Sequence, residues 1–258
     1  LNSRKIWQAL LPSLGLEALI RNLPKITNLR LISDDILSRL ANQSEINAAM
    51  INPIKALYAR KTYNLGRNIK GKQTWVPDDR VKLALDKTFQ LSFNGEPTGK
   101  HYLIAMDVSG SMQCAKICDM EMTCAEASAA IAMMFVRLEE NTKTMAFSGN
   151  FIELDIRPDD DLDVVMEKTA HLPFNFTRID VAIKTALERR IKVDVFIILT
   201  DNDCGYGEHP HKVLADYQRI MQIPARVVVI GMVSNKFTVA EPGNACMMDI
   251  VGFDTATP

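Results

Sequence analysis

The sequence has 258 residues, of which 47% are hydrophobic and 24% are charged, and this is the composition of an ordinary globular protein. A chain of this length buries a core without disulfides or structural metals, so disorder, collagen-like repeats and a disulfide scaffold are excluded. The net charge of −1 conceals an asymmetry, because residues 1–100 carry a net charge of +8 and residues 101–258 a net charge of −9. This asymmetry predicts two units, a basic one for a polyanion and an acidic one for a cation.

Cysteine usage and the apolar runs indicate the compartment. The five cysteines contain no C-x-x-C pair, which predicts reduced thiols and a cytoplasmic protein, with the nucleus as a second compartment. Apolar runs such as residues 227–233 are far shorter than the roughly 18 residues of a membrane span, so we expect no membrane partner. The first residues do not resemble a signal peptide, and we expect the sequence to be part of a longer protein.

Residues 1–95 predict a succession of short helices. Ser33 stands before two aspartates, which is typical of a capped helix start. Ser44 predicts the start of another helix that ends before Pro53, and Pro53 and Pro77 each predict a further start. The absence of a strand pattern indicates an array of helical hairpins. We expect more hairpins upstream, because two or three cannot bury both faces.

Residues 101–258 change from helical to alternating elements. The apolar run 101–106 predicts a buried strand, and an alanine-rich helix is expected at 123–140. Strands that alternate with helices indicate βαβ units, so the predicted fold class is α/β, a mainly parallel sheet with helices on both faces. A turn-rich joint at 95–99 predicts one domain over residues 1–95 and a second over 96–258. Further strands are expected at 144–147, 151–154, 193–199 and 226–230, and further helices at 163–169 and 179–189.

Oxygen-bearing side chains follow two of the predicted strands. Asp107, Ser109 and Ser111 form a D-x-S-x-S run after the first strand, and Asp201 follows the strand at 193–199. Ligand sites of doubly wound sheets form at the carboxyl ends of strands where the strand order reverses. We therefore expect these four side chains to converge there with the hydroxyl of Thr177. Two carboxylates and three hydroxyls suit Mg²⁺ or Mn²⁺.

Helix capping is the alternative interpretation of the D-x-S-x-S run. Aspartate and serine after a strand often begin the next helix by accepting hydrogen bonds from its first N–H groups. An isolated run does not distinguish capping from metal binding. Thr177 and Asp201, at the expected topological positions, favour the metal.

A basic segment in the first part predicts a surface for phosphates. No acidic residue lies between Glu45 and Asp78, whereas lysines and arginines accumulate there among aromatic residues. Basic side chains attract phosphates and aromatic faces stack on unpaired bases, so RNA is the predicted ligand. The alternative is a solvated helix face with the rings packed inward. The candidate RNA-binding residues are Arg60, Lys61, Arg67, Lys70 and Lys72, and the interleaved aromatic residues are Tyr58, Tyr63 and Trp75.

No set of catalytic residues is evident. His209 and His211 begin a predicted helix, and we interpret both as structural residues rather than ligands. No Ser/His/Asp or Cys/His group has a matching context, and the glycine-containing loop at 205–207 is not a P-loop because no Gly-Lys-Ser/Thr follows it. We therefore predict that the protein is not an enzyme.

The motifs resemble two known families. The D-x-S-x-S run, Thr177 and the segment 199–201 together resemble the metal-ion-dependent adhesion site of von Willebrand factor A domains. Nearly the whole chain resembles the 60-kDa Ro ribonucleoprotein autoantigen family, and that combination is more specific than the run alone. The segments that carry the second resemblance are 7–11, 21–23, 75–79, 96–100, 194–197, 200–202, 209–210 and 252–255.

The resemblance implies both a fold and a function. It implies a ring of HEAT-like helical repeats, the TROVE module, closed by a Rossmann-like von Willebrand A domain, with a monomeric ring in the full-length protein. It implies binding of small noncoding Y RNAs and of single-stranded ends of misfolded RNAs. It also implies a divalent cation at Asp107, Ser109, Ser111, Thr177 and Asp201, whose open position takes an acidic group from a protein ligand.

One motif departs from the family pattern. The family's loop usually reads Gly-Gly-Thr-Asp, whereas residues 175–178 read Asn-Phe-Thr-Arg. The threonine is present, but we expect the neighbouring Arg178 to weaken or reshape cation binding. Two other functions stay open at this point: a protein-interaction A domain without an RNA role, and a metal-assisted phosphohydrolase. The second is disfavoured because the sequence has no D-x-D-x nucleophile loop and no general base in a matching context.

Overall fold

The structure is a computed structural model in which the chain divides into two compact units between Asn94 and Gly95. The helical unit comprises the residues up to Asn94, with which Glu121 also groups, and the sheet unit comprises the rest. Across the described residues, no helix combines the length and the apolar character needed to cross a membrane. The structure describes residues 3–69, 71–117, 121–147, 150–173, 178–201, 207–233 and 239–251.

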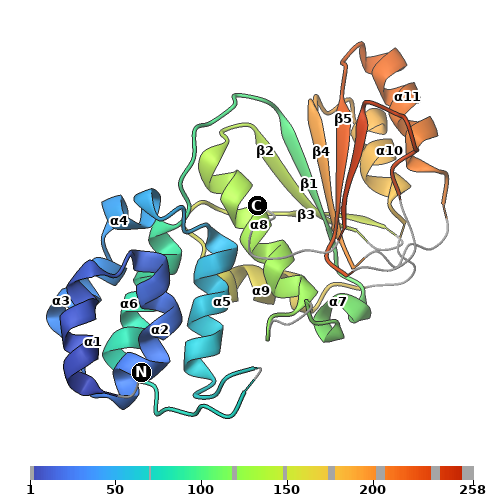
Figure 1. Ribbon diagram of the computed structural model, residues 1–258. Coiled ribbons are helices and arrows are strands. Elements are labelled where there is room, and N and C mark those ends of the chain that lie inside the picture. The colour runs from blue at the N-terminus through green and yellow to red at the C-terminus, as the bar shows by residue number, and fades with distance from the viewer. Residues whose placement is uncertain are drawn as a thin grey trace. The chain divides into compact units, whose positions relative to one another are not determined.

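The helical unit consists of short helices (Figure 1). Side chains cap those that begin after Ser33, Asn42, Asn52 and Asp78. Ser33 accepts a hydrogen bond from the Ile36 N–H at 3.5 Å, as predicted. The helix expected at Ser44 begins one residue earlier, because Asn42 provides its cap by accepting from the Glu45 N–H at 3.0 Å. The helices are α1 (Arg4–Leu10), α2 (Leu16–Asn28), α3 (Asp34–Leu40), α4 (Gln43–Ala48), α5 (Pro53–Asn64) and α6 (Asp79–Leu91), with a 3-10 turn η1 (Leu11–Ser13) after α1.

The core of the helical unit lies where α6 packs on α3 and α5, and where α5 packs on α2. Leu19, Leu57 and Phe89, on α2, α5 and α6, are almost fully buried. The hydroxyl of Thr88 donates to the Leu40 carbonyl at 2.7 Å across the α6–α3 contact. This bond is buried, so it satisfies the last carbonyl of α3 where water does not reach.

The sheet unit is built on six strands in the order β3-β2-β1-β4-β5-β6. All neighbouring pairs are parallel except β2 and β3, which form the antiparallel hairpin predicted at 144–154. The α/β fold class is therefore confirmed. The strands are β1 (Tyr102–Asp107), β2 (Thr142–Phe147), β3 (Phe151–Leu154), β4 (Val195–Thr200), β5 (Arg226–Gly231) and β6 (Met247–Val251).

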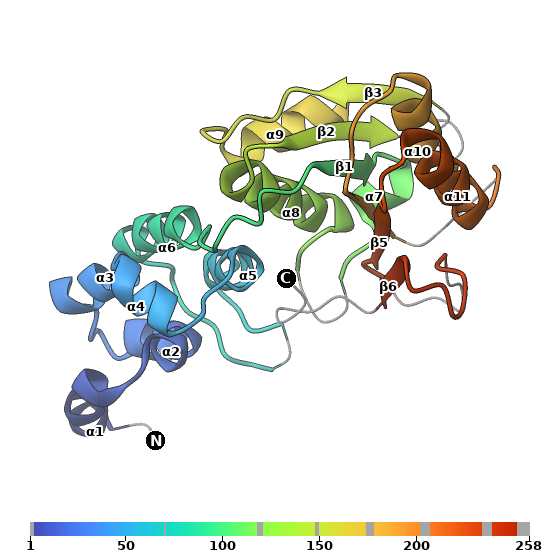
Figure 2. The ribbon, with the colours of Figure 1, turned by 90° about the horizontal axis from the view of Figure 1, so that it is seen from above.

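Helices cover both faces of this sheet, α8 and α9 on one and α10 and α11 on the other (Figures 1 and 2). On the second face, Tyr217 of α11 meets Phe196 of β4 edge to face, with ring centroids 5.1 Å apart. Its buried hydroxyl donates to the Ile191 carbonyl at 2.7 Å and accepts from the Val193 N–H at 2.8 Å. The helices are α7 (Gly110–Cys114), α8 (Cys124–Leu138), α9 (Leu162–Ala170), α10 (Asp180–Glu188) and α11 (Pro210–Met221).

In the sheet unit, α7 and β6 are absent from the sequence prediction. Helix α7 has only five residues and lies within the D-x-S-x-S run, which the prediction treats as a loop. Strand β6 carries Asp249 at its centre, which breaks its apolar pattern. That carboxylate accepts from the Val239 and Ala240 N–H groups at 2.8–3.0 Å, so it anchors the preceding segment to the strand.

Candidate functional site

The four predicted metal ligands that the structure describes end or follow β1 and β4, at the centre of the sheet's carboxyl edge. Strands β1 and β4 are neighbours, with Met106 opposite Leu199. From β1 the chain continues toward β2, and from β4 it continues toward β5. The strand order therefore reverses between β1 and β4, as predicted. Asp107 ends β1 and Asp201 follows β4, and both are buried, with 3% and 6% of their surfaces exposed.

Asp107 is held in a fixed orientation. One of its carboxylate oxygens accepts from the Ser109 N–H at 2.9 Å, and the other accepts from the Thr200 hydroxyl at 2.9 Å. Burial raises the pKa of Asp107 to about 6, against the opposing effect of these hydrogen bonds. The negative charge of Asp201 raises that pKa further, because two carboxylates at one site disfavour each other's ionised form.

The serine hydroxyls point toward each other rather than into a helix cap. Ser109 occupies the N-cap position of α7, yet its side chain makes no capping hydrogen bond. Its Oγ lies 3.0 Å from the Oγ of Ser111. Ser109 is buried and Ser111 is exposed, so the two hydroxyls lie between the interior and the solvent. The side chain of Ser109 therefore does not cap α7, contrary to the alternative interpretation. Thr177 lies outside the described residues.

A buried thiol is exposed to the charge of both carboxylates. Cys124 begins α8 and is fully buried. Burial raises the pKa of its thiol to about 12, and the charges of Asp201 and Asp107 act in the same direction. Among the described residues, no lysine, arginine or histidine forms an ion pair with Asp107. Buried carboxylates with hydroxyl oxygens beside them are a donor set that fits a hard divalent cation.

A second buried carboxylate, Asp180 at the start of α10, has the opposite environment. Arg178 contacts it through two nitrogens at 2.8 and 3.2 Å, and the Lys184 ammonium lies at 2.8 Å. Burial acts to raise the pKa of Asp180, but these contacts and the Glu208 N–H outweigh it, so the pKa is lowered. The charge of Arg178, next to the expected ligand Thr177, is thus balanced by Asp180.

The close approach of Gly207 to Asp180 fixes another segment near this carboxylate. A Cβ at Gly207 would lie 2.3 Å from the Asp180 Oδ1, and the backbone there has φ +148°. Both conditions require glycine. Gly207 and Glu208, just before α11, therefore lie against the start of α10.

The aromatic residues of the basic segment mostly support the fold of the helical unit. Tyr63 and Trp75 are buried, and the Trp75 indole N–H donates to the Tyr63 carbonyl at 2.8 Å. The Tyr63 hydroxyl lies 2.8 Å from the Thr27 hydroxyl and accepts from the Asp78 N–H at 3.1 Å. These two rings pack inward, as the alternative interpretation had it, and Tyr58 is half-buried.

Residues 66–75, here called the basic loop, project from this packed pair. Asn68 donates its N–H to the Gln73 carbonyl at 2.9 Å, and Trp75 donates to the Gly66 carbonyl at 2.9 Å. A Cβ at Gly66, where φ is +67°, would lie 2.9 Å from the Trp75 carbonyl oxygen, so the hairpin requires glycine at its entry.

The five candidate RNA-binding residues fall into two groups. Arg67 and Lys72 are exposed on the basic loop, although the Arg67 guanidinium lies 3.9 Å from the Glu121 carboxylate. Arg60 and Lys61 are half-buried on α5, and Arg60 pairs with Asp86 at 2.6 Å. Lys70 lies outside the described residues. The structure thus favours the loop residues over the helix residues as a surface for phosphates.

Comparisons with known proteins agree with this architecture. A family model described as the Ro60 vWA domain matches residues 101–258, and the TROVE domain model matches residues 1–143. The chain belongs to the Ro60 family. It is 36% identical to the RNA-binding protein RO60 of Caenorhabditis elegans, over 100% of this chain and 41% of that protein. It is 33% identical to the RNA-binding protein RO60 of Deinococcus radiodurans, over 98% of this chain and 50% of that protein.

The structural comparison extends over both units. The crystal structure of the Deinococcus radiodurans RO (RSR) protein superposes with a TM-score of 0.93 and 33% identity, and covers 99% of this chain and 54% of that one. The chain therefore spans about half the length of the Ro60 relatives it matches. Membership in the family confirms the resemblance to Ro proteins and the combination of a TROVE helical part with a von Willebrand A fold.

Sequence reasoning missed some functional neighbours of the candidate site. Thr200 was part of the motif but had no assigned role, whereas it bonds to Asp107. Asp180 was predicted only as part of a helix, although it binds Arg178. Its position on the first turn of α10, three residues after Thr177, is a signal that was available. Cys124 offered none, because the carboxylates whose charges act on its thiol, Asp107 and Asp201, are distant from it in sequence.

Proposed function

We propose that this chain is the RNA-binding part of a Ro-type ribonucleoprotein, which binds small noncoding RNAs of the Y type and single-stranded ends of misfolded RNAs. The observation that carries the proposal is its similarity, along nearly its whole length, to proteins named as RNA-binding from a nematode and a bacterium. The proposed role is binding rather than catalysis. In the full-length protein, the helical unit would be part of a monomeric ring of such repeats.

The basic loop supports a contact with the RNA backbone. Arg67 and Lys72 are exposed on a hairpin that the buried Tyr63–Trp75 pair holds in place. Exposed lysines and arginines on a fixed hairpin attract phosphates without reading sequence. Recognition of RNA ends and loops would then depend on charge and shape.

The sheet unit would hold a divalent cation, Mg²⁺ or Mn²⁺. Asp107, Ser109, Ser111 and Asp201 would provide oxygen ligands together with Thr177, whose position the structure does not describe. A bound cation would neutralise the two buried carboxylates and bind an acidic group of a partner protein at its open position. Ser111, which is exposed, lies on the side from which such a group would approach.

A gel-shift experiment tests RNA binding by this chain. A structured small RNA is compared with and without a single-stranded 3′ tail, at about 50 and about 200 mM salt, because phosphate contacts weaken steeply over that range. The proposal expects tail-dependent binding that weakens with salt. If the chain binds no RNA, or binds it regardless of tail and salt, the alternative is favoured: a protein-interaction module without an RNA role.

Matched variants locate the contact. Arg67→Ala and Lys72→Ala each remove one proposed phosphate contact, so each is expected to weaken binding several-fold and to reduce the salt slope by about 1. Arg21→Ala and Lys87→Ala remove equally exposed charges from α2 and α6 and serve as controls. Equal losses of RNA affinity in all four variants would show that the basic loop is not the site of RNA contact.

A further inference from the structure

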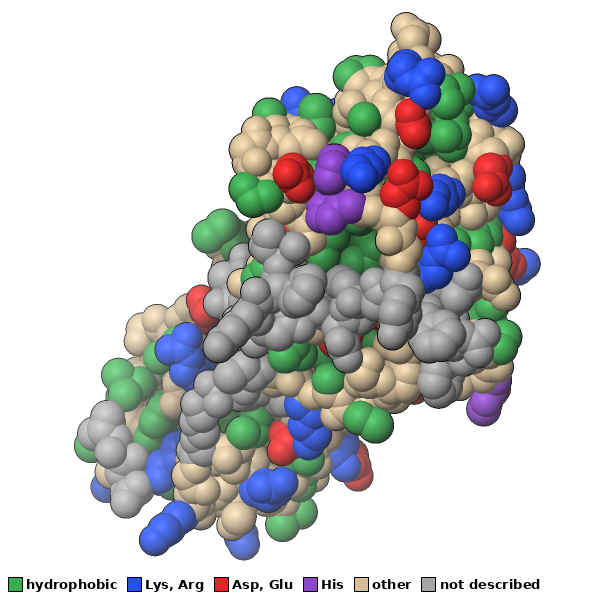
Figure 3. All heavy atoms as spheres, turned by 90° about the vertical axis from the view of Figure 1, so that its right-hand side faces the viewer, with side chains coloured by type: hydrophobic (Ala, Val, Ile, Leu, Met, Phe, Trp, Pro, Cys, Tyr) green, Lys and Arg blue, Asp and Glu red, His purple; other side chains and the backbone are tan. Residues whose placement is uncertain are grey.

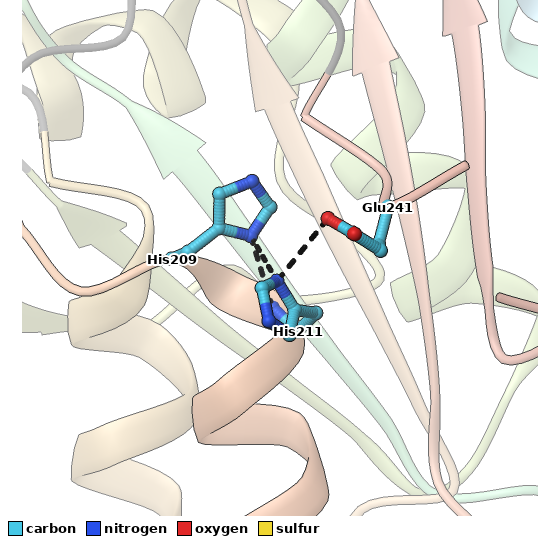
Figure 4. Close-up of side chains that lie close together, drawn as sticks. All are labelled: His209, His211 and Glu241. Carbon is cyan, nitrogen blue, oxygen red and sulfur yellow. Dashed lines mark hydrogen bonds and ion pairs between the residues drawn. The ribbon is translucent and has the colours of Figure 1, made fainter.

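Three side chains that the proposed function does not use converge on one point (Figure 4). The Nδ1 atoms of His209 and His211 are 2.6 Å apart, and the His211 Nδ1 lies 3.4 Å from the Glu241 Oε2. One nitrogen or oxygen atom from each residue lies within 4.8 Å of the other two. A pair of histidine side chains is visible on the surface of the sheet unit in Figure 3. The cluster is open to solvent.

The local sequence explains why the Nδ1 atoms of the two imidazoles face each other. His209 is the N-cap of α11, with extended backbone angles of φ −61° and ψ 129°, and the buried Pro210 follows at the first helical position. An N-cap side chain folds back over the first turn of its helix. The His209 Nδ1 accordingly faces the His211 N–H at 3.5 Å, and the two ring centroids are 4.4 Å apart. The His-Pro-His sequence thus forms a helix start that pairs two imidazoles.

Glu241 is brought to the same point by a different part of the chain. The two residues before it, Val239 and Ala240, donate their N–H groups to the Asp249 carboxylate on β6. The Glu241 carbonyl accepts from the Asn244 N–H at 3.1 Å. The backbone around Glu241 is therefore positioned by β6 and by a turn, independently of the histidines.

The donor atoms have the chemistry of a transition-metal site. Two imidazole nitrogens and one carboxylate favour zinc and its neighbours, whereas Mg²⁺ and Ca²⁺ prefer oxygen alone. Zinc binds these ligands at about 2.0–2.1 Å in a tetrahedron, which places the ligand atoms about 3.3 Å apart. The His211–Glu241 separation of 3.4 Å matches this value. The His209–His211 separation of 2.6 Å must increase by less than about 1 Å, which a small rotation of the exposed His209 ring provides.

We propose that His209, His211 and Glu241 bind a divalent transition-metal ion of the zinc class, with water at the remaining position. The ion joins the start of α11 to the segment before β6. It differs in ligand type from the oxygen-lined centre at Asp107, so the two sites select different metals. This site is independent of the proposed RNA binding.

Zinc titration of the chain tests the proposal. Isothermal titration calorimetry at neutral pH should show one zinc ion bound per chain in the Asp107→Ala variant, which lacks the oxygen-lined centre. In that background, His211→Gln and Glu241→Gln should each lower zinc affinity more than tenfold, because each removes one of three ligands. Both residues are at the surface and Gln is similar in shape, so the fold is expected to persist, which circular dichroism checks.

A matched histidine provides the control. His171, exposed at the end of α9, is outside the cluster, so His171→Gln should leave zinc affinity unchanged. Cobalt in place of zinc should give the visible absorption of a four-coordinate ion without a thiolate charge-transfer band. Equal zinc affinity in all variants, no zinc binding at all, or a thiolate band that assigns the ion to cysteine would each overturn the proposal.

Discussion

Asp107 and Asp180 are two buried carboxylates of the sheet unit with opposite electrostatic environments. Asp180 has 1% of its surface exposed and is surrounded by Arg178, Lys184 and a backbone N–H, so its pKa is lowered. Asp107 has 3% exposed, and burial together with the charge of Asp201 raises its pKa to about 6. Among the described residues, cationic side chains therefore pair with Asp180 but not with Asp107, where the proposed external cation would supply the counter-charge. A buried acid is a candidate ligand when its counter-charge is missing.

The largest expected effect is the loss of the carboxylate that the chain neutralises itself. Asp180→Ala leaves two cations beside a cavity, and breaking a buried ion pair by removing one partner is strongly destabilising. Arg178 and Lys184 are each about one-third exposed, so solvent screens part of this effect, and we expect a loss of about 3 kcal/mol.

Thermal or urea unfolding measures this loss with an exposed pair as control. Asp155 forms the same kind of pair with Arg157 at the surface, where the side chains are 72% and 66% exposed. Asp155→Ala should therefore leave the free energy of unfolding close to that of the parent chain. Similar losses in the two variants would contradict the contrast between buried and exposed pairs.

The second-largest effect is expected at the centre formed by Asp107 and Asp201. Mg²⁺ or Mn²⁺ should raise the free energy of unfolding by about 2.7 kcal/mol at 100 times its dissociation constant, because it binds only the folded state. Asp107→Ala and Asp201→Ala should abolish this increment, whereas Asp180→Ala should retain most of it. Melting curves with Mg²⁺ and with a chelator measure the increment in each variant. Equal increments in Asp107→Ala and the parent chain would show that the cation binds elsewhere.

A smaller effect is expected where backbone approaches Asp180. Gly207→Ala places a methyl group on the Asp180 carboxylate at a positive φ, so we expect a loss of about 1–2 kcal/mol. Gly243→Ala is the control, because φ is +80° there but no atom lies within 4 Å of the new Cβ. In an Asp180→Ala background the cost of Gly207→Ala should fall toward that of Gly243→Ala. If Gly207→Ala destabilises the Asp180→Ala variant as much as the parent chain, the loss does not come from the contact with Asp180.

The smallest effect involves a half-exposed carboxylate. Burial acts to raise the pKa of Asp194, but hydrogen bonds from the His101 N–H and ring at 2.8 and 3.0 Å outweigh it and lower the pKa. A lowered folded-state pKa stabilises the fold above the unfolded value, about 3.9, and this contribution is lost as the pH falls through the folded value. Asp194→Asn should thus lower stability at neutral pH by less than about 1 kcal/mol and flatten its decline between about pH 5 and 3. A decline as steep as that of the parent chain would assign the acid sensitivity to other carboxylates.

The sheet was predictable because its buried strands are short runs of consecutive apolar residues. Residues 102–106 and 195–199 are continuous apolar runs, and parallel strands buried on both faces have this pattern. The convergence of Asp107 and Asp201 followed from topology alone. Strand β6 was not predictable in this way, because its central Asp249 turns to bind the backbone of the segment before it.

The helical unit shows what periodicity leaves open. The spacing of Tyr63 and Trp75 was compatible with either an exposed or a buried pair, since helical periodicity identifies faces but not which neighbour covers them. Tyr63 is buried partly because its hydroxyl contacts the hydroxyl of Thr27, which lies 36 residues away in the sequence. The cluster of His209, His211 and Glu241 was missed for the same reason: its third member lies 30 residues from the second in sequence.

The buried thiol of Cys124 has a consequence for labelling chemistry. Maleimides and iodoacetamide react with the thiolate, so a thiol with a pKa of about 12 and no exposed surface reacts very slowly. Cys114, by contrast, is a free and exposed cysteine on α7. A fluorophore placed on Cys114 would therefore lie three residues from Ser111 while Cys124 stays unmodified. The native chain thus carries an attachment point for an optical probe close to its carboxylate centre.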